Sequence, residues 1–198
     1  MIRPYRPTDR AAVYDICVRT AQDGGDSRAV YPDVELLPSI FAGPYLELAP
    51  SLAFVLDDGG QAVGYVLGAA DTAAFVAAYR SRWLPNLVSR FPLPAEVTTP
   101  SDHMITLMHD PERMMLLPLI ADYPAHLHID LLPAYQRRGH GRALMERLLT
   151  ALRAAGVPAV HLGMVTTNTN ARAFYDRLGF HEIDVPNPGP VTYLGLRL

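Results

Sequence analysis

A strand, a glycine-containing loop and a helix follow one another directly near residue 135, and this succession constrains the fold more than any other part of the chain. Residues 125–132 alternate polar and apolar side chains up to Pro133, which predicts a strand. The loop Gln136-Arg137-Arg138-Gly139-His140-Gly141 comes next. Its glycines let backbone N–H groups approach an anion closely, and the following helix adds unpaired N–H donors and a positive dipole end. A pyrophosphate is the ligand that such a site suits.

The helix after the loop is predicted from about Gly141 to Ala155. Met145 and Leu149 widen an apolar stripe that predicts one buried face. The stripe itself consists of Leu144, Leu148, Leu152 and Ala155. Gly156 suits the C-terminal cap, and Pro158 prevents continuation of the helix. The loop is not a dinucleotide-binding fingerprint, because it lacks the first glycine and the preceding strand–helix context.

Composition narrows the function classes. All 17 basic residues are arginine, so the charge around the loop comes from Arg137, Arg138 and Arg142. The absence of lysine excludes a P-loop and Schiff-base chemistry. A formal net charge of -3 argues against non-specific binding to nucleic acid or to anionic membranes. No apolar run approaches the roughly 20 residues of a membrane span, and the first residues lack a signal peptide. We expect a cytoplasmic protein.

The first half of the chain predicts a strand, two helices and a hairpin. A strand at residues 2–6 precedes a helix that Thr8 would cap, with Val13, Ile16, Cys17 and Thr20 at helical spacing. The lone Cys17 predicts a buried structural thiol. A second helix covers about residues 35–48. Asp57-Asp58-Gly59-Gly60 then forms the turn of a hairpin between residues 52–56 and 62–69.

The remaining segments complete one predicted domain over residues 1–198. Residues 72–90 predict a helix interrupted at Pro85, and further prolines punctuate the chain up to residue 121. We interpret residues 71–121 as an elaboration without a core of its own. After the helix at 141–155 we expect a strand at 159–164, a helix at 170–178 and strands near 180–185 and 191–196. A chain of 198 residues buries a sizeable single core.

Two motifs in the C-terminal half of the chain resemble those of the GNAT superfamily of N-acetyltransferases. Residues 131–144, Leu-Leu-Pro-Ala-Tyr-Gln-Arg-Arg-Gly-His-Gly-Arg-Ala-Leu, resemble its acetyl-CoA motif, Q/R-x-x-G-x-G/A after a strand. Residues 168–180 resemble its second motif, N-x-x-A-x-x-F/L-Y-x-x-x-G-F. The resemblance implies an α/β (α+β) GNAT fold, in which helices flank a mixed and mainly antiparallel sheet.

The N-terminal half carries a narrower resemblance, to the C-terminal acetyltransferase-like domain of O-GlcNAcases. It rests on Ile2-Arg3-Pro4-Tyr5, residues 13–20, Gly43-Pro44-Tyr45-Leu46 and Gly64-Tyr65-Val66-Leu67-Gly68, and it continues through Trp83-Leu84-Pro85. The chain therefore resembles a stand-alone, bacterial-type relative of that domain. Nothing in it provides the glycosidase barrel.

The GNAT resemblance implies that acetyl-CoA binds between the strand ending near Leu132 and the next strand. Backbone at Leu131 and Leu132 would pair with the pantetheine, amides from Arg137 to Arg142 would hold the pyrophosphate, and Asn168 would bond to the pantetheine. Tyr175 would protonate the departing thiolate; a packed structural tyrosine is the alternative. The implied cofactor-binding residues are Leu131, Leu132, Gln136, Arg137, Arg138, Gly139, His140, Gly141, Arg142, Asn168 and Tyr175.

The group that accepts the amine proton is predicted less directly. His126, His128 and Asp130 share one face of a regular strand, although a bulge, frequent in this family, would break that parity. We prefer Asp130, which lies nearest the loop; a solvated or capping Asp is the alternative. A metal site at His126 and His128 lacks further ligands, so no metal is expected. An acidic stretch of Asp23, Asp26, Asp33 and Glu35 would attract a cationic amine, or is simply a solvated loop.

Two functions remain open at this point. The first is direct transfer of acetyl from acetyl-CoA to an amine of a small molecule or peptide, without a covalent enzyme intermediate. The alternative is a pseudo-acetyltransferase that binds acetyl-CoA as a sensor or interaction module. Neither the acceptor nor a homodimer is specified by the residues.

Overall fold

The computed structural model describes residues 1–22 and 24–198, and Asp23 lies outside the described residues. Its sheet has seven strands in the order β1-β2-β3-β4-β5-β7-β6. The pairs are antiparallel except for β4 with β5, which is parallel. The strands are β1 Ile2–Pro4, β2 Ala53–Asp58, β3 Gln61–Ala69, β4 Ala125–Leu131, β5 Ala159–Val165, β6 His181–Ile183 and β7 Val191–Arg197.

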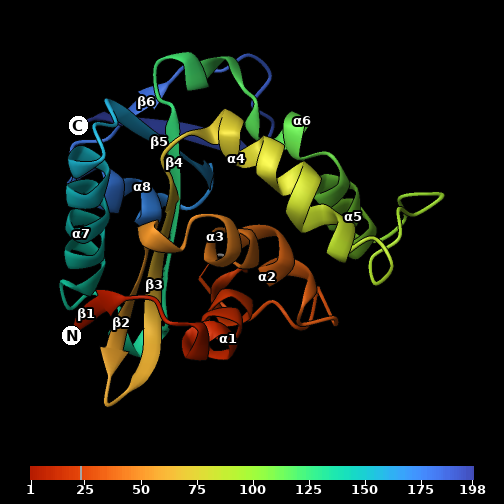
Figure 1. The fold of residues 1–198 in the computed structure, drawn as a ribbon, viewed down its shortest axis with the longest axis horizontal. Coiled ribbons are helices and arrows are strands. Elements are labelled where there is room, and N and C mark those ends of the chain that lie inside the picture. The colour runs from red at the N-terminus through yellow and green to blue at the C-terminus, as the bar shows by residue number, and fades with distance from the viewer. Residues whose placement is uncertain (23) are drawn as a thin grey trace.

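Helices cover both faces of this sheet (Figure 1). They are α1 Arg10–Thr20, α2 Leu36–Phe41, α3 Gly43–Leu48, α4 Thr72–Ala78, α5 Pro100–His109, α6 Pro111–Met115, α7 His140–Ala154 and α8 Thr169–Asp176. Leu144 and Leu148 of α7 pack with Leu127 of β4 in one buried cluster. Tyr65 and Leu67 of β3 face the opposite side, in a cluster with α1, α2 and α3. Because side chains alternate along each strand, the two faces of the sheet pack into these two different clusters.

The sequence predicts most elements to within two residues of their observed ends. The mixed, mainly antiparallel sheet is confirmed, as are the hairpin at Gly59 and Gly60, both at positive φ, and the buried Cys17. The prediction that Thr8 caps α1 is wrong. Thr8 lies inside a 3-10 turn, Pro7–Asp9, that precedes α1, and the Asp9 carboxylate accepts a 2.8 Å bond from the Arg6 N–H. No helix of the described residues is both long and apolar enough to span a membrane.

Two predicted helices have different ends from those expected. The helix predicted over residues 35–48 is broken at Ala42, whose φ of -129° and ψ of -58° are not helical. The break lets Gly43 lie against Trp83, where an added Cβ would come within 2.7 Å of the indole. Ala155 was expected in the buried stripe of α7 but is exposed, because the helix ends at Ala154 and Gly156 turns the chain with φ 72°.

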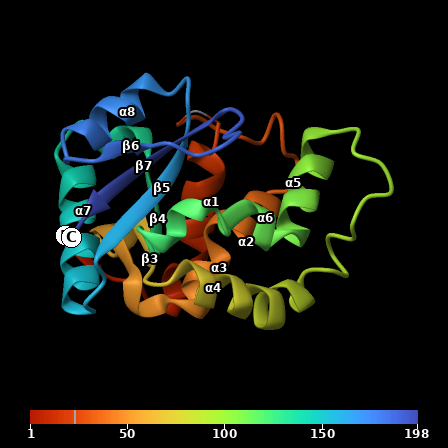
Figure 2. The same cartoon turned by 90° about the horizontal axis from the view of Figure 1, so that it is seen from above.

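The segment at residues 71–121 contains more helix than the sequence suggests. Pro100 and Pro111 occupy the first turns of α5 and α6, where proline is favoured, and the Thr99 and Asp110 side chains cap these helices. Figure 2 shows α4, α5 and α6 beside α2 and α3, with a long loop extending outward. Buried side chains of the segment share the α1–α3 core: Phe75, Val76, Tyr79, Trp83, Leu84, Phe91, Met108 and Met115. This sharing favours the single-domain interpretation, which stays a prediction.

Candidate active site

The parallel strands β4 and β5 pair over a short stretch only. Their register consists of Ala125 opposite Val160 and His126 opposite His161. On its other side, β4 pairs with β3 in unbroken register as far as Leu131, so no bulge disturbs that side. We call residues 127–131 the open edge of β4, because their described pairing is with β3 alone. Antiparallel alternation turns the backbone groups of every second residue of this edge away from β3.

Leu131 and Leu132 differ in where their backbone groups point. The Leu132 N–H donates to the Val63 carbonyl of β3 at 3.1 Å, and the Leu132 carbonyl accepts a 2.8 Å bond from Tyr135. The Leu131 carbonyl instead accepts a 2.9 Å bond from the Gln136 side chain, on the side away from β3. Gln136 thereby ties the glycine loop to the end of the open edge. Of the two leucines, Leu131 is the one oriented for an added strand.

The glycine loop turns the chain sharply into α7. Arg137 and Gly139 have φ of 59° and 84°, and Gly139 is the N-terminal cap residue of α7. A Cβ placed on Gly139 would meet nothing within 4 Å, so its need for glycine is conformational. Gly141 lies against the Phe174 ring, which an added Cβ would approach to 3.2 Å. The first N–H groups of α7, at His140 to Arg142, have no intrahelical acceptors and are available to an anion.

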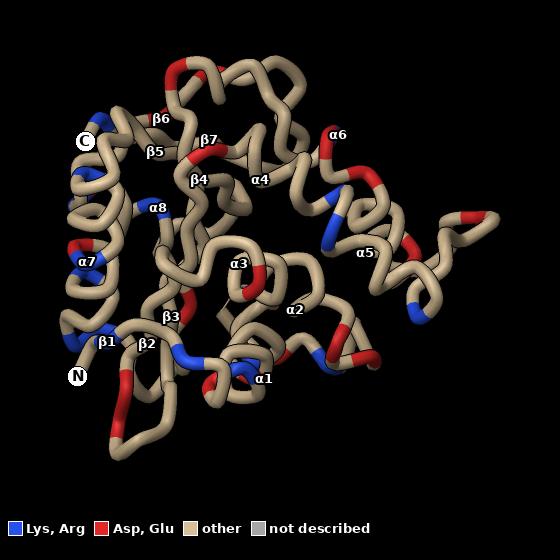
Figure 3. The backbone as a smooth tube through the Cα atoms, in the orientation of Figure 1, with Lys and Arg blue, Asp and Glu red and all other residues tan. Residues whose placement is uncertain are grey.

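Arginines surround the beginning of α7. Arg137 and Arg138 are exposed, and Arg142 donates to the Arg177 carbonyl at 3.2 Å, which links α7 to the end of α8. Figure 3 shows basic residues near the junction of α7 and β1 and acidic residues in the β2–β3 hairpin. The loop is therefore locally basic although the chain carries a net charge of -3. This local charge suits a pyrophosphate.

Helix α8 positions Asn168 and Tyr175, the two predicted site residues of the second motif. The Asn168 side-chain oxygen caps the helix by accepting a 3.0 Å bond from the Ala171 N–H, a role that sequence reasoning did not assign to it. Tyr175 is 8% exposed and packs with the rings of Phe174 and Phe180. Burial raises the pKa of its phenol well above the ordinary value, and the charge of Asp130 raises it further. Tyr175 is thus protonated at neutral pH and lies within electrostatic reach of Asp130.

Both ring nitrogens of His126 are hydrogen bonded. His126 lies at the closed end of β4, residues 125–126, where β4 pairs with β5. Its Nδ1 is 2.8 Å from the Thr72 hydroxyl and its Nε2 is 2.8 Å from the Tyr45 hydroxyl. The Thr72 hydroxyl donates its one hydrogen to the Pro124 carbonyl at 2.7 Å. It must therefore accept from Nδ1–H, which leaves Nε2 to accept from Tyr45. Burial and the neighbouring His161 and His128 lower the pKa of His126 well below its usual value, so it stays neutral.

His128 lies one position further along the same face and is neutral as well. The rings of Phe41 and Tyr45 contact it edge-on, with centroids at 5.7 and 5.2 Å. Burial lowers the pKa of His128 to about 4, with a further contribution from His161. A group this weakly basic holds a proton poorly at neutral pH.

Asp130 lies at the open edge, on the face of β4 that packs toward α1. Its carboxylate accepts a 2.6 Å hydrogen bond from the hydroxyl of Tyr65, the residue directly opposite it on β3. Protein surrounds the carboxylate, yet the residue keeps some exposed surface. Burial raises the pKa of Asp130 to about 6, opposed by the hydrogen bond from Tyr65. It is therefore ionised above neutral pH but much closer to accepting a proton than an ordinary aspartate.

The acidic stretch between α1 and α2 is engaged elsewhere. Asp33 pairs with Arg90 at 3.1 Å, and Asp26 pairs with Arg28 at 3.4 Å. Glu35 lines a pocket of about 610 Å³ over the outer face of α1, away from the glycine loop, together with Pro7, Thr8, Arg10, Ala11, Tyr14, Asp15, Val18, Arg28 and Val34. Asp23 belongs to the predicted stretch but lies outside the described residues. The described acids of this stretch are not gathered around Asp130.

Sequence reasoning did not identify Tyr45 and Tyr65 as part of this site. Tyr65 lies in a strand of apolar residues, and Tyr45 in a short helix, so each reads as core. Alternation along β3 places Tyr65 on the same face as Leu67, but only the β3–β4 register brings it opposite Asp130. That register joins residues 65 positions apart in the chain.

Comparison of the sequence with known proteins identifies a family and several relatives. The profile of the acetyltransferase (GNAT) family matches residues 100–180. O-GlcNAcase of Rattus norvegicus is 26% identical over 184 residues, which are 92% of this chain but only 20% of that protein. The chain thus spans about one fifth of that relative. The ribosomal protein bS18 alanine N-acetyltransferase of Escherichia coli K12 is 37% identical over 67 residues, 34% of this chain and 45% of that enzyme.

Among solved structures, the crystal structure of SsHAT is 62% identical to this chain, with a TM-score of 0.95. The match covers 100% of this chain and 97% of that one. The residues that the family profile matches, 100–180, include β4, the glycine loop, α7, β5 and α8. The chain belongs to the GNAT family of acetyltransferases.

Proposed function

We propose that this protein transfers an acetyl group from acetyl-CoA directly to an amine at the open edge of β4. The observation that carries the proposal is the position of the Asp130 carboxylate, which Tyr65 holds at the open edge directly before the glycine loop. Asp130 belongs to the face of the sheet that packs on α1, whereas Tyr175 belongs to the cluster under α7. A continuous sheet would separate them. β5 pairs with β4 only as far as His126, and the negative charge of Asp130 contributes to the raised pKa of Tyr175.

The two groups are held in opposite protonation states. The pKa of Asp130, about 6, leaves it ionised at slightly alkaline pH, whereas the phenol of Tyr175 keeps its proton. Pairs of groups whose environments separate their pKa values are suited to the roles of base and acid. In this scheme the amine nitrogen attacks the thioester carbon, and Asp130 takes the proton that the nitrogen loses. The C–S bond breaks, and Tyr175 protonates the departing thiolate.

The glycine loop provides the binding part of the proposal. The amides at the start of α7 would hold the pyrophosphate, with Arg137, Arg138 and Arg142 adding charge. The open edge would take the pantetheine as an added strand through Leu131. Asn168 would keep its cap on α8 while its amide nitrogen faces the pantetheine. The acceptor is an amine of a small molecule or peptide; the E. coli relative is named for an alanine of a ribosomal protein.

Two measurements on the full chain test the proposal. Calorimetry with acetyl-CoA should give saturable binding, and thiol release in the presence of a panel of primary amines should exceed the rate without amine. Binding without amine-dependent thiol release on any member of a broad panel would favour the sensor function instead. Absence of saturable binding would contradict both functions.

A further inference from the structure

The Asp130 carboxylate has one strong hydrogen-bond donor on the protein side, and this donor comes from the neighbouring strand. The Tyr65 hydroxyl reaches it at 2.6 Å. Thr20 of α1 also lies close enough to influence the carboxylate. However, the Thr20 hydroxyl donates its single hydrogen to the Ile16 carbonyl at 2.7 Å. Tyr65 is therefore the donor that can hold the charged carboxylate in place.

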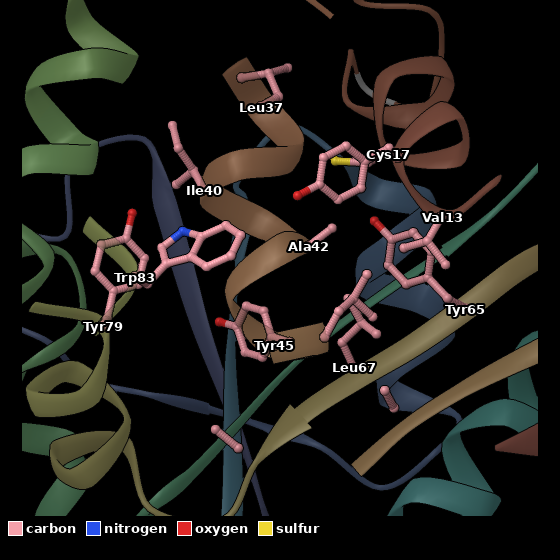
Figure 4. Packing of buried hydrophobic residues seen from close by; sticks show 14 of the residues in the cluster. Val13, Cys17, Leu37, Ile40, Ala42, Tyr45, Tyr65, Leu67, Tyr79 and Trp83 are labelled. Carbon is pink, nitrogen blue, oxygen red and sulfur yellow. The ribbon is translucent and has the colours of Figure 1, made fainter. Parts of the chain in front are cut away.

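Tyr65 is built to be immobile. Its side chain is 0% exposed, and it lies in the centre of β3 with strands paired on both sides. Figure 4 shows its hydroxyl pointing toward the side where Cys17 of α1 lies. The Cys17 thiol on that side is itself buried, so α1 packs closely over the phenol. A phenol fixed in this way presents its hydrogen in one direction, toward Asp130.

The other groups around Asp130 do not supply positive charge. Cys17 faces it from α1, Tyr175 from α8 and His128 from its own strand, and all three are neutral at pH 7. Within the part of the chain that the structure describes, Asp130 forms no ion pair with an arginine. A buried carboxylate without a cation depends on hydrogen bonds for its ionised form.

We propose that Tyr65 is a positioning residue for the transfer reaction, which orients the Asp130 carboxylate at the open edge and keeps it charged near neutral pH. This inference rests on the proposed role of Asp130 as base. It predicts a defined change when the hydroxyl is removed. Because the hydrogen bond favours the charged form, its loss must move the titration of Asp130 to higher pH.

The test compares Tyr65→Phe with Tyr79→Phe. Tyr79 is a matched control, because it is also 0% exposed and lies in the same core cluster, but its hydroxyl has no partner among the described residues. Carbon-13 NMR of labelled aspartate follows the titration of Asp130 directly, with Asp130→Asn to assign the signal. Tyr65→Phe should raise the titration midpoint by roughly one to two pH units, the size of a hydrogen bond to a charged group. Tyr79→Phe should leave it unchanged.

The rate of amine-dependent thiol release should follow the same shift. In Tyr65→Phe the acidic limb of the kcat/KM profile should move up by the same interval, with most of the activity regained at pH 9. Site-specific 3-fluorotyrosine at position 65 is more acidic and isosteric, so it should move the limb in the opposite direction; it also serves if Tyr65→Phe does not fold. An unmoved Asp130 titration in both variants would overturn the inference. A moved titration with no thiol release in any variant would leave the inference standing and contradict the proposed function.

Discussion

The two ends of β4 differ in how the polar side chains on one strand face are surrounded. At the closed end, β4 pairs with both neighbours, and both ring nitrogens of His126 are hydrogen bonded. At the open edge, β4 pairs with β3 alone, and Asp130 keeps exposed surface and one strong protein donor. The residues are four positions apart and point the same way. Polar identity alone therefore does not distinguish the proposed base Asp130 from His126; the divergence of β5 does.

The largest expected effect is on stability at the open edge. In the folded protein the pKa of Asp130 is about 6, against 3.8 in an exposed reference, so ionisation of this residue opposes folding. This destabilisation is absent below about pH 4, where Asp130 is protonated in both the folded and the unfolded protein. It is complete above about pH 6, where Asp130 is ionised in both. Two units correspond to about 3 kcal/mol. Asp130→Asn should therefore stabilise the protein by up to about that amount at pH 7.5, and by little at pH 4.

Urea unfolding of Asp130→Asn and wild type across this pH range measures the difference. The variant keeps an oxygen that accepts the Tyr65 bond, so packing should be preserved. A stability difference that does not change with pH would contradict the assigned burial of the charged group. The same variant should lower turnover while leaving acetyl-CoA affinity intact.

The next effect concerns Tyr175, the proposed acid. Tyr175→Phe removes the phenol and should slow turnover by about 100-fold where proton transfer limits the rate. Affinity for acetyl-CoA should stay nearly unchanged, because the proposed contacts with the pyrophosphate and the pantetheine involve other residues. Tyr193→Phe on β7 is a suitable control, since that phenol is outside the proposed reaction. Full activity of Tyr175→Phe with a working acceptor would reduce Tyr175 to a structural residue.

A smaller effect is expected at the closed end. Tyr45→Phe leaves Nε2 of the buried His126 without its donor, which should cost about 2 kcal/mol of folding free energy. Tyr79→Phe removes a buried hydroxyl that lacks a partner within the described part of the chain and should cost much less. Denaturant unfolding of the two variants compares them. Equal costs would mean that the hydrogen-bonded chain through His126 contributes nothing.

The smallest predicted effect is on the glycine loop. Gly139→Val demands φ near 84° from a branched residue and blocks approach to the α7 amides, so acetyl-CoA should bind at least tenfold more weakly, about 1.4 kcal/mol. Gly156→Val is the matched control at the other end of α7, with φ 72° and equally open space. Both should lose stability similarly, but only Gly139→Val should lose affinity in calorimetry. Equal affinities would contradict the assignment of the loop.

Local parts of this site are predictable from the sequence, whereas the environments of its side chains are not. Glycine positions and apolar spacing predict the loop from Gln136 to Gly141 and the helix after it, because these signals depend on nearby residues only. The partner of Asp130, in contrast, comes from a strand 65 positions away, and no local pattern indicates it. Prolines at residues 100 and 111 suggest interruptions of regular structure in the sequence. In the fold they lie in the first turns of α5 and α6, because proline is also favoured where a helix begins.

Hydrogen exchange measures most directly whether acetyl-CoA pairs with the open edge of β4, as we propose. Amide exchange followed by NMR, with and without saturating acetyl-CoA, should show slower exchange at Leu131 and at the amides from Arg137 to Arg142. The closed end, at Ala125 and His126, is already paired with β5 and should change little. Saturable binding that protects neither Leu131 nor the start of α7 would contradict the account.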